Sequence, residues 1–258
     1  NHIYDIKSQF GDGIYICRSK NITAAFNTIH DITRIGICAD TNAPGLVSSN
    51  ITVVYNWIYH AYGASGGELN GGVWFENVHG GVIHGNIVED TSSVGNGKCR
   101  GIVVTALIID GKDHPYHITN NILINTGVGI ATGGSQVNGA KLFVDNNSIH
   151  GDYDTGMYFS EGTDVKVSNC YFDKGTVTLF RIGAYSDTAD VNVTIENCSY
   201  GNDVNFVPTV NLISTEGNKK CNVTINNLVG KWTIRQHPET LNGKLKIRNT
   251  DVVLLQGT

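Results

Sequence analysis

The sequence predicts an all-β solenoid that runs along the whole chain, and three observations predict it. A twelve-residue phrase at residues 21–32 returns at residues 50–61, and the chain starts with the second half of another copy. Between the copies, β-branched residues alternate with polar ones, as in strands with one buried face, and no segment reads as a helix. A turn asparagine recurs roughly every 22 to 35 residues, which is the spacing of solenoid repeats.

Each repeat is expected to contain at least two strands. One strand family covers residues 165–167, 193–195, 223–225 and 245–247, and a second covers residues 14–16, 35–37, 73–75, 102–104, 128–130 and 157–159. An asparagine amide at the turn can donate to one neighbouring coil and accept from the other, while its backbone tolerates the bend. We therefore expect an asparagine ladder through Asn1, Asn27, Asn56, Gly85, Asn120, Asn146, Asn169, Asn197, Asn227 and Asn249.

The composition agrees with a turn-rich solenoid. Of the 258 residues, 40% are hydrophobic, only 16% are charged and 31 are glycine. The uninterrupted repeat predicts a single domain over residues 1–258, with about nine to ten coils. Because the first residues fall inside a repeat, we expect the chain to be a fragment that lacks upstream sequence.

Charge and hydropathy narrow the possible partners. The net charge is −5, and the basic residues cluster only at Lys219 with Lys220 and at Lys244 with Lys246, so we expect no nucleic acid partner. The longest nearly apolar run, residues 101–109, is far too short to cross a bilayer, so we expect no membrane insertion.

The six cysteines fall partly into columns when the coils are aligned. Cys17 lies over Cys38, and Cys170 lies over Cys198, each pair about 4.8 Å apart along the stack. These pairs are interpreted as apolar stacks of free thiols, with disulfides between coils as the alternative. No zinc motif is present, and we expect no metal site. Calcium at Asp110 with Asp113, or at Asp152 with Asp154, is the alternative to solvated turn carboxylates.

Insertions rich in glycine and polar residues cluster in the first half of the chain, at residues 39–49, 60–71, 90–100, 109–116 and 133–140. Such loops usually form the binding face of a solenoid. The site is therefore expected on coils two to five.

The second strand family places side chains outward in two columns. The first is Tyr15, Gly36, Trp74, Val103, Gly129 and Tyr158, and the second is Cys17, Cys38, Glu76, Thr105, Ala131 and Ser160. Large outward aromatics usually cover a partner, either a sugar ring or a loop folded over the sheet. The candidate substrate-binding residues are Trp74, Tyr15 and Tyr158, with Arg18 and His84 near the loops.

Carboxylates surround the first column. Hydrolysis of a glycosidic bond needs one protonated and one ionised carboxyl group about 5–10 Å apart. Residues on adjacent coils meet this distance, so Asp40 with Glu76, or Glu76 with Glu89 or Asp90, are the candidate catalytic pairs. The acid is expected to be Glu76, because the wall of Trp74 would raise its pKa by desolvation. A weaker candidate column is Asp5, Asp31, His60 and Glu89, and the alternative for each is a solvated carboxylate.

The turn asparagines and the strand pattern resemble the right-handed, single-stranded parallel β-helix of the pectate-lyase-like group over essentially the whole chain. Phrases such as residues 13–16 (Gly-Ile-Tyr-Ile) and 27–31 (Asn-Thr-Ile-His-Asp), with large glycine-rich side loops, resemble the β-helix of bacteriophage tailspikes and related polysaccharide-degrading enzymes. The resemblance implies a homotrimer at an extracellular or virion surface that cleaves polysaccharide without a cofactor. It also implies that neighbouring chains can share the carboxylates.

The leading hypothesis is therefore a glycoside hydrolase that binds and cleaves an extracellular or capsular polysaccharide. The runner-up is a polysaccharide lyase or epimerase, with Ca²⁺ as a possible cofactor and a base drawn from Arg18, Arg34, His79, His84, Lys98 and Arg100. The third hypothesis is a non-catalytic glycan-binding or structural module.

Overall fold

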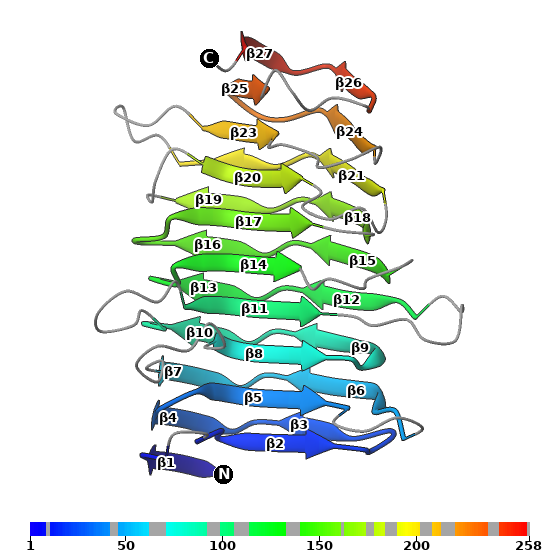
Figure 1. Cartoon of the computed structure of the whole chain (residues 1–258). Coiled ribbons are helices and arrows are strands. Elements are labelled where there is room, and N and C mark those ends of the chain that lie inside the picture. Colours follow the sequence, from blue (N-terminus) through cyan, green and yellow to red (C-terminus); the bar gives the residue numbers. More distant parts are fainter. Residues whose placement is uncertain are drawn as a thin grey trace.

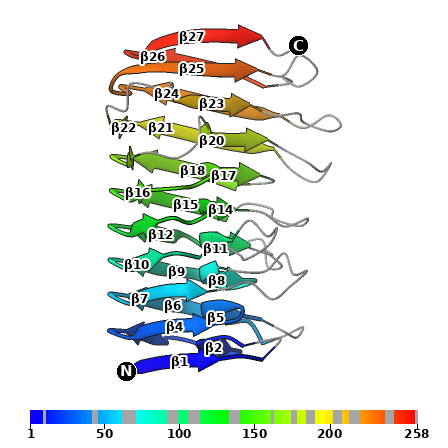
Figure 2. The ribbon, with the colours of Figure 1, turned by 90° about the vertical axis from the view of Figure 1, so that its left-hand side faces the viewer.

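The structure is a computed structural model that describes residues 1–8, 11–41, 46–61, 71–91, 99–105, 114–132, 140–160, 163–173, 178–183, 190–201, 208–212, 220–236 and 243–256. Within these ranges every regular element is a β-strand, and the strands form three sheets, here named A, B and C. Figures 1 and 2 show the coils stacked in chain order from β1 to β27. No helix in the described ranges is long and apolar enough to span a membrane.

Sheet A contains eight strands, β1 (His2–Ile6), β4 (Thr28–Ile32), β7 (Trp57–Ala61), β10 (Ile87–Glu89), β13 (Ile122–Ile124), β16 (Ser148–His150), β19 (Tyr171–Asp173) and β22 (Ser199–Tyr200). Sheet B contains ten, β2 (Ile14–Cys17), β5 (Ile35–Asp40), β8 (Gly71–Glu76), β11 (Arg100–Thr105), β14 (Val128–Thr132), β17 (Thr155–Ser160), β20 (Thr178–Gly183), β23 (Thr209–Leu212), β25 (Lys231–Gln236) and β27 (Asp251–Gln256). Sheet C contains nine, β3 (Thr23–Ala25), β6 (Ser49–Val54), β9 (His79–His84), β12 (Tyr116–Thr119), β15 (Ala140–Asp145), β18 (Thr163–Ser168), β21 (Val191–Glu196), β24 (Cys221–Asn226) and β26 (Leu245–Arg248).

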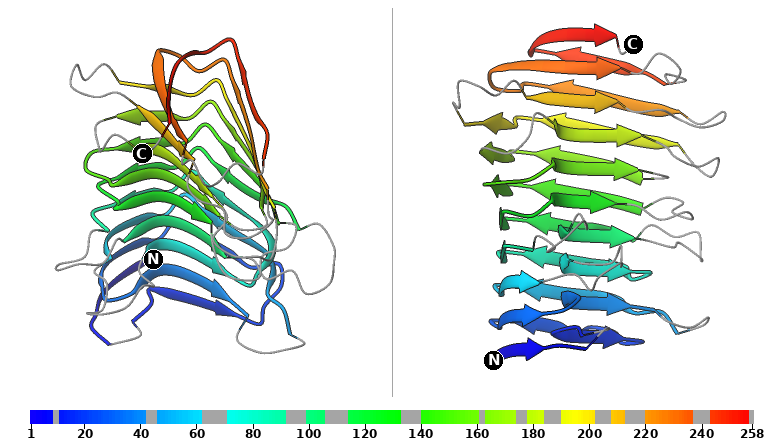
Figure 3. Two further views of the ribbon diagram at one scale, coloured as in Figure 1. Left: turned by 45° about the horizontal axis from the view of Figure 1, so that its top comes forward. Right: turned by 60° about the vertical axis from the view of Figure 1, so that its left-hand side comes forward.

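The chain visits sheets B, C and A in turn and then returns to sheet B one strand further along, as β2, β3, β4 and β5 do. All strand pairings between coils are parallel, and Figure 3 shows the sheets wrapped around one axis. This is the right-handed parallel β-helix that the sequence predicted. A full coil, such as β2, β3 and β4, holds three strands, in agreement with the expected minimum of two.

Inward side chains from the three sheets form one continuous core from Ile16 to Ile234. Sheet A contributes an aliphatic and aromatic column, Ile29, Ile58, Val88, Leu123, Ile149 and Phe172. Opposite this column, a row of glycines lines the start of the sheet B strands, at Gly13, Gly36, Gly72, Gly101, Gly129 and Gly156. The glycine row lets sheet A approach sheet B closely, because no side chain stands between them.

Gly72→Ala is expected to destabilise the fold by about 1–3 kcal/mol, since overpacking a tight core costs this amount. A Cβ at Gly72 would lie 2.2 Å from Val88 Cγ1 and 2.8 Å from the carbonyl oxygen of Gly101, so core and backbone must both shift. Urea denaturation measures the loss. Ala25→Val is the control, because it adds carbon at an outward position whose neighbour in the next coil is Val54. Similar losses for the two variants would contradict the steric role of the glycine row.

The asparagine ladder exists and runs through Asn1, Asn27, Asn56, Asn86, Asn121 and Asn147. From Asn1 to Asn121, each side-chain Nδ2 donates to the Oδ1 of the ladder asparagine in the next coil at 2.8–3.0 Å. Further donation to backbone carbonyls, as from Asn121 to Ile83, satisfies these buried amides. Beyond Asn147, the same position holds Cys170, Cys198 and Leu228.

The predicted column leaves the buried ladder after Asn56, because it joins two neighbouring columns, although Asn146 Nδ2 in this second column also donates to Asn120 Oδ1 at 2.5 Å, in an exposed bond. Gly85, Asn120, Asn146, Asn169, Asn197, Asn227 and Asn249 each precede the ladder position by one residue and have a positive φ between 47° and 65°. Phe26 and Tyr55 occupy this second column in the first coils. Asparagine suits both a left-handed backbone and an amide ladder, so consecutive asparagines do not reveal which of the two carries the ladder.

All six cysteines are free, as the sequence interpretation favoured, and the disulfide alternative is not realised. Cys170 and Cys198 lie in consecutive coils at the ladder position. The other predicted stack is wrong, because Cys17 pairs in register with Asp40 and Cys38 pairs with Tyr15.

Candidate functional site

The strand register of sheet B defines which outward residues are neighbours. The first outward column is Tyr15, Cys38, Trp74, Val103, Ala131, Tyr158 and Arg181, and the second begins Cys17, Asp40, Glu76 and Thr105. The sequence columns were therefore wrong at Gly36 and Gly129, which face the sheet A core, and at Cys38 and Ala131. A glycine has no side chain that would indicate which face of the strand it belongs to. Ile35 points outward into the outer apolar cluster, but as an aliphatic residue it is expected to point inward.

The predicted platform Trp74 is 1% exposed. It packs in an outer apolar cluster with Ile35, Cys38, Val103, Val128 and Ala131, and the Arg100 guanidinium lies 5.6 Å from its ring centroid. Tyr158 is half-buried against this cluster, 5.6 Å from the Arg181 guanidinium. Tyr15 is 46% exposed, so among the three predicted aromatics its ring is the open one.

Asp40 and Glu76 form a carboxylate pair on sheet B. Asp40 ends β5 and Glu76 ends β8, and the two residues are direct partners in the strand register. Parallel strands lie about 4.8 Å apart, so the two carboxyl groups leave the sheet from neighbouring positions. The structure therefore brings together one of the pairs that the sequence proposed.

The surroundings of Glu76 favour its protonated form. Burial raises the pKa of the Glu76 carboxyl above its usual 4.5, the charge of Asp40 raises this pKa further, and Arg34 acts in the opposite direction. The predicted role of Trp74 as the wall that desolvates Glu76 stays a prediction, with Trp74 itself buried in the outer apolar cluster. A carboxyl with a raised pKa beside a second carboxylate is a common feature of catalytic sites.

Asp40 is held by donors on both oxygens. Tyr15 Oη donates to Oδ2 at 3.0 Å, and the backbone NH of Thr41 donates to Oδ1 at 2.5 Å. Burial, followed by hydrogen bonding to Cys17 and Asp40, raises the pKa of the Tyr15 hydroxyl and keeps it a donor. Two donors suit an ionised carboxylate, which only accepts hydrogen bonds. The sequence did not predict this role for Tyr15.

Arg34 forms an ion pair next to β5, the strand that carries Asp40. Its Nε lies 3.0 Å from Oδ1 of Asp12, whose pKa is raised by burial and lowered in turn by Arg34. Arg18, predicted to bind substrate, follows β2 directly after Cys17, the strand neighbour of Asp40, and is exposed. Arg34 directly precedes β5, which carries Asp40, and Arg18 directly follows β2, the neighbouring strand.

The remaining predicted residues lie elsewhere. His84 is on sheet C, where its ring contacts the Tyr55 hydroxyl at 3.1 Å and the Thr119 hydroxyl at 2.8 Å. Glu89 ends β10 on sheet A beside Tyr59, and Asp90 follows it, so neither is a strand neighbour of Glu76. Of the predicted pairs, strand pairing supports Asp40 with Glu76.

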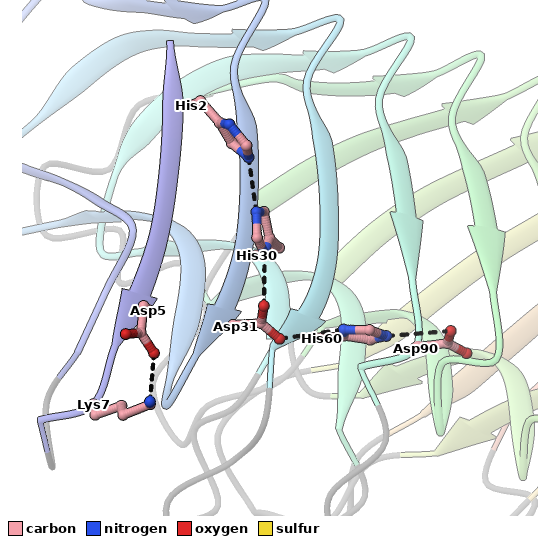
Figure 4. Close-up of polar contacts among 7 residues, drawn as sticks. All are labelled: His2, Asp5, Lys7, His30, Asp31, His60 and Asp90. Carbon is pink, nitrogen blue, oxygen red and sulfur yellow. Dashed lines mark hydrogen bonds and ion pairs between the residues drawn. The ribbon is translucent and has the colours of Figure 1, made fainter.

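Asp90 belongs to a row of imidazoles and carboxylates at the edge of sheet A, drawn in Figure 4. His30 Nδ1 lies 2.7 Å from Asp31 Oδ2, and His60 lies between Asp31 at 3.3 Å and Asp90 at 3.9 Å. The hydrogen bond from His30 lowers the pKa of Asp31. The predicted column Asp5, Asp31, His60 and Glu89 is thus correct in three members, and its fourth is Asp90, which shares their left-handed backbone.

Sheet A also carries exposed aromatic rings that the sequence analysis missed. Tyr4, His30 and Tyr59 stack along the axis with ring centroids 5.4 and 4.6 Å apart, and Trp57 lies 4.9 Å from Tyr59. Tyr4 is 60% and Trp57 is 45% exposed. The signal was present in the repeated phrases at residues 3–5, 29–31 and 58–60, which read Ile-Tyr-Asp, Ile-His-Asp and Ile-Tyr-His.

Among the residues that the structure describes, no group of three or more histidines, cysteines and carboxylates is arranged to hold a metal ion. The calcium candidates Asp110 and Asp113, and the candidate base Lys98, lie outside the described residues. Most of the predicted insertions lie outside them as well. The expectation that the protein works without a cofactor stays a prediction.

No known protein-family profile matches this chain, and no curated protein sequence matches it. The fold defines the chain as a right-handed parallel β-helix. Since unrelated activities use this scaffold, any activity has to be argued from the residues of the site itself.

Proposed function

We propose that this protein is a glycoside hydrolase that cleaves an extracellular or capsular polysaccharide. The observation that carries the proposal is the register pair of Asp40 and Glu76, in which the pKa of Glu76 is raised. One protonated and one ionised carboxyl group on neighbouring strands are what the hydrolysis of a glycosidic bond requires.

The environments of the two carboxyl groups assign their roles. Glu76 is the general acid, which protonates the leaving oxygen of the scissile bond. Asp40, held by Tyr15 and Thr41, is the nucleophile. Strands about 4.8 Å apart fit the separation of about 5–5.5 Å typical of retaining enzymes better than the wider inverting one. Asp40 therefore attacks the anomeric carbon, and Glu76 then deprotonates the water that releases the sugar.

Resemblance to tailspikes and related polysaccharide-degrading β-helix proteins supports a polymeric substrate, a homotrimer and a location at an extracellular or virion surface. The exposed ring of Tyr15 beside Asp40 supports sugar contact at the same place, because an aromatic ring with a polar hydroxyl suits a carbohydrate surface. In such a trimer a neighbouring chain would complete the substrate cleft.

Product analysis tests the proposal. The protein is incubated with a panel of bacterial capsular and extracellular polysaccharides, and the products are followed by reducing-end assay, by ultraviolet absorbance and by proton NMR of the anomeric centre. New reducing ends that first appear with retained configuration are the expected result. Unsaturated ends would show that the protein is a lyase and not a hydrolase. Products with inverted configuration would show that water attacks directly and that Asp40 is not a nucleophile.

A second candidate function is a glycan-binding module without catalysis, which the exposed rings of Tyr4 and Trp57 on sheet A favour. Binding to a polysaccharide of the panel with no new ends after prolonged incubation would select this alternative.

A further inference from the structure

A polar groove lies on sheet C, across β21, β24 and β26, whose strands are at the upper end of the stack in Figure 1. It is a shallow depression of about 340 Å³ lined by Asp190, Asn192, Lys220, Asn222, Thr224, Lys244 and Lys246. None of these residues belongs to the carboxylate pair on sheet B, so the groove is a separate feature of the molecule.

The floor of the groove is a row of amides and hydroxyls held in register. Asn222 Nδ2 donates to Asn192 Oδ1 at 2.9 Å, and Asn192 Nδ2 donates to Asp164 Oδ1 at 2.7 Å. The backbone NH of Lys244 closes the row by donating to Asn222 Oδ1 at 3.1 Å. Thr224 lies beside the row, next to Lys246 in the adjacent strand.

The rim of the groove carries three lysines whose ammonium groups form no ion pair with any residue that the structure describes. Lys166, on the same outward column as Thr224 and Lys246, is different, because its Nζ lies 2.6 Å from Glu196 Oε1. The carboxylate at the rim, Asp190, accepts the backbone NH of Lys220 at 2.9 Å. Three ammonium groups without carboxylate partners gather here on a chain of net charge −5.

We propose that this groove binds an acidic polysaccharide, with Lys220, Lys244 and Lys246 holding its carboxylate or sulfate groups and Asn192, Asn222 and Thr224 contacting its hydroxyls. Ammonium groups attract anions of either kind, and amides and hydroxyls can both donate to and accept from sugar hydroxyls. Lys220 directly precedes β24, and Lys244 and Lys246 belong to the next coil, about 4.8 Å further along the stack. An extended polymer that crosses these neighbouring coils would meet all three ammonium groups.

The same charges would attract a nucleic acid, but the lining argues against one. Single-stranded nucleic acids bind by stacking their bases on aromatic side chains along a basic groove. Among the described residues that line this groove none is aromatic, and Asp190 would repel a dense row of phosphates. A polymer with widely spaced charges and many hydroxyls fits the lining better.

Binding by the intact chain tests the proposal independently of any cleavage. The probes are polygalacturonate for carboxylate, dextran sulfate for sulfate, neutral dextran of matched length, and a single-stranded oligothymidylate. The wild type is compared with the Lys220→Gln, Lys244→Gln, Lys246→Gln triple variant, and with Lys246→Gln and Lys166→Gln as single variants. Dissociation constants are measured by thermophoresis at two salt concentrations.

The expected result is binding to at least one acidic glycan, weaker at high salt, and roughly 10-fold or more weaker in the triple variant. Each exposed charge contact contributes about a 2- to 5-fold change in affinity. Lys246→Gln should lower affinity within that range, whereas Lys166→Gln should leave it unchanged, although both remove one charge from the same column. The probe that binds more tightly identifies the anionic group.

The proposal is overturned if the triple variant binds acidic glycans as the wild type does, or if Lys166→Gln weakens binding as much as Lys246→Gln. Equal affinity for neutral dextran, or tighter binding of the oligothymidylate than of both acidic glycans, would also overturn it. Thermal melting of each variant confirms folding, and the two single variants suffice if the triple variant does not fold.

Discussion

Glu76→Gln is expected to abolish cleavage, lowering kcat by at least about 100-fold, because a positioned general acid contributes about 10²–10⁴ in rate. Glutamine keeps the shape of the side chain but cannot donate a proton with the strength of a carboxylic acid. The affinity for polysaccharide should change little, so the loss falls on kcat rather than on KM. Initial rates of reducing-end formation and binding by the inactive variant measure the two quantities.

Two further variants sharpen this test. Asp40→Asn should silence turnover as Glu76→Gln does, since both members of the pair are required. Glu196→Gln, on sheet C and paired with Lys166, is the matched control and should leave the rate unchanged. Full activity in Glu76→Gln and Asp40→Asn, with folding intact, would place the chemistry elsewhere, and the carboxylates Asp31 and Asp90 on sheet A would be examined next.

The raised pKa of Glu76 also predicts how stability depends on pH. The folded protein binds the proton of Glu76 more tightly than the unfolded chain, for which 4.5 is the reference value. The stability from this group is therefore fully present below about pH 4.5 and is lost as pH rises through the raised pKa. The difference in unfolding free energy, Glu76→Gln minus wild type, should therefore be more favourable to the variant at pH 7 than at pH 4. Urea denaturation at both pH values measures this, and a pH-independent difference would argue against the shift.

Asn147→Ala is expected to cost about 2–5 kcal/mol of stability, the second large effect. Asn147 Oδ1 accepts from both the backbone NH and the side-chain Nδ2 of Asn121 at 3.0 Å, and its own Nδ2 donates to Ile118 O at 2.8 Å. Truncation leaves these buried groups unpaired, at about 1–3 kcal/mol each. Chemical denaturation monitored by circular dichroism measures the loss.

The neighbouring asparagine supplies the control for this prediction. Asn146 is exposed, has φ 53°, and donates from Nδ2 to Asn120 Oδ1 in the adjacent coil at 2.5 Å. Asn146→Gly keeps the backbone conformation and removes only this solvent-exposed bond, so it should cost less than about 1 kcal/mol. The ladder assignment from sequence alone, which chose Asn146, would give the opposite order. A larger loss for Asn146→Gly than for Asn147→Ala would mean that the observed ladder does not stabilise the protein.

The fold was predictable because the strand period and the turn spacing repeat along the whole chain. Each repeat predicts the same strands and turns, so the signal is strong even where a single repeat is irregular. The register, meaning which residues of neighbouring coils lie side by side, was less predictable. Asn146 and Asn147 are chemically identical, and Gly36 carries no side chain to show that it faces the core. A slip of one residue turns a side chain to the opposite face of the sheet, whereas a slip of two residues keeps the face and moves the side chain to the next column. A slip of two residues is how Cys38 was placed over Cys17 instead of beside Tyr15.

The candidate site was predictable only in part, for a related reason. Asp40 and Glu76 could be paired because both end a strand of one family, so their separation follows from the coil spacing. The burial of Trp74 and the donation from Tyr15 to Asp40 depend on the register between coils. The aromatic row on sheet A lies on a third strand of each coil. The two strand families identified from the sequence did not include this strand.

The replacement of asparagine by cysteine and leucine after Asn147 divides the stack into two kinds of linkage. Up to Asn147, neighbouring coils share amide-to-amide hydrogen bonds at the ladder position, whereas the buried Cys170, Cys198 and Leu228 at the same position have no amide, and the two thiols donate weakly to backbone carbonyls. Contacts of the second kind weaken on cooling, since burial of nonpolar surface is driven by entropy near room temperature. In a solenoid each coil contacts only its neighbours, so we expect cooling to weaken the ladder position more in the coils after Asn147 than in those before it.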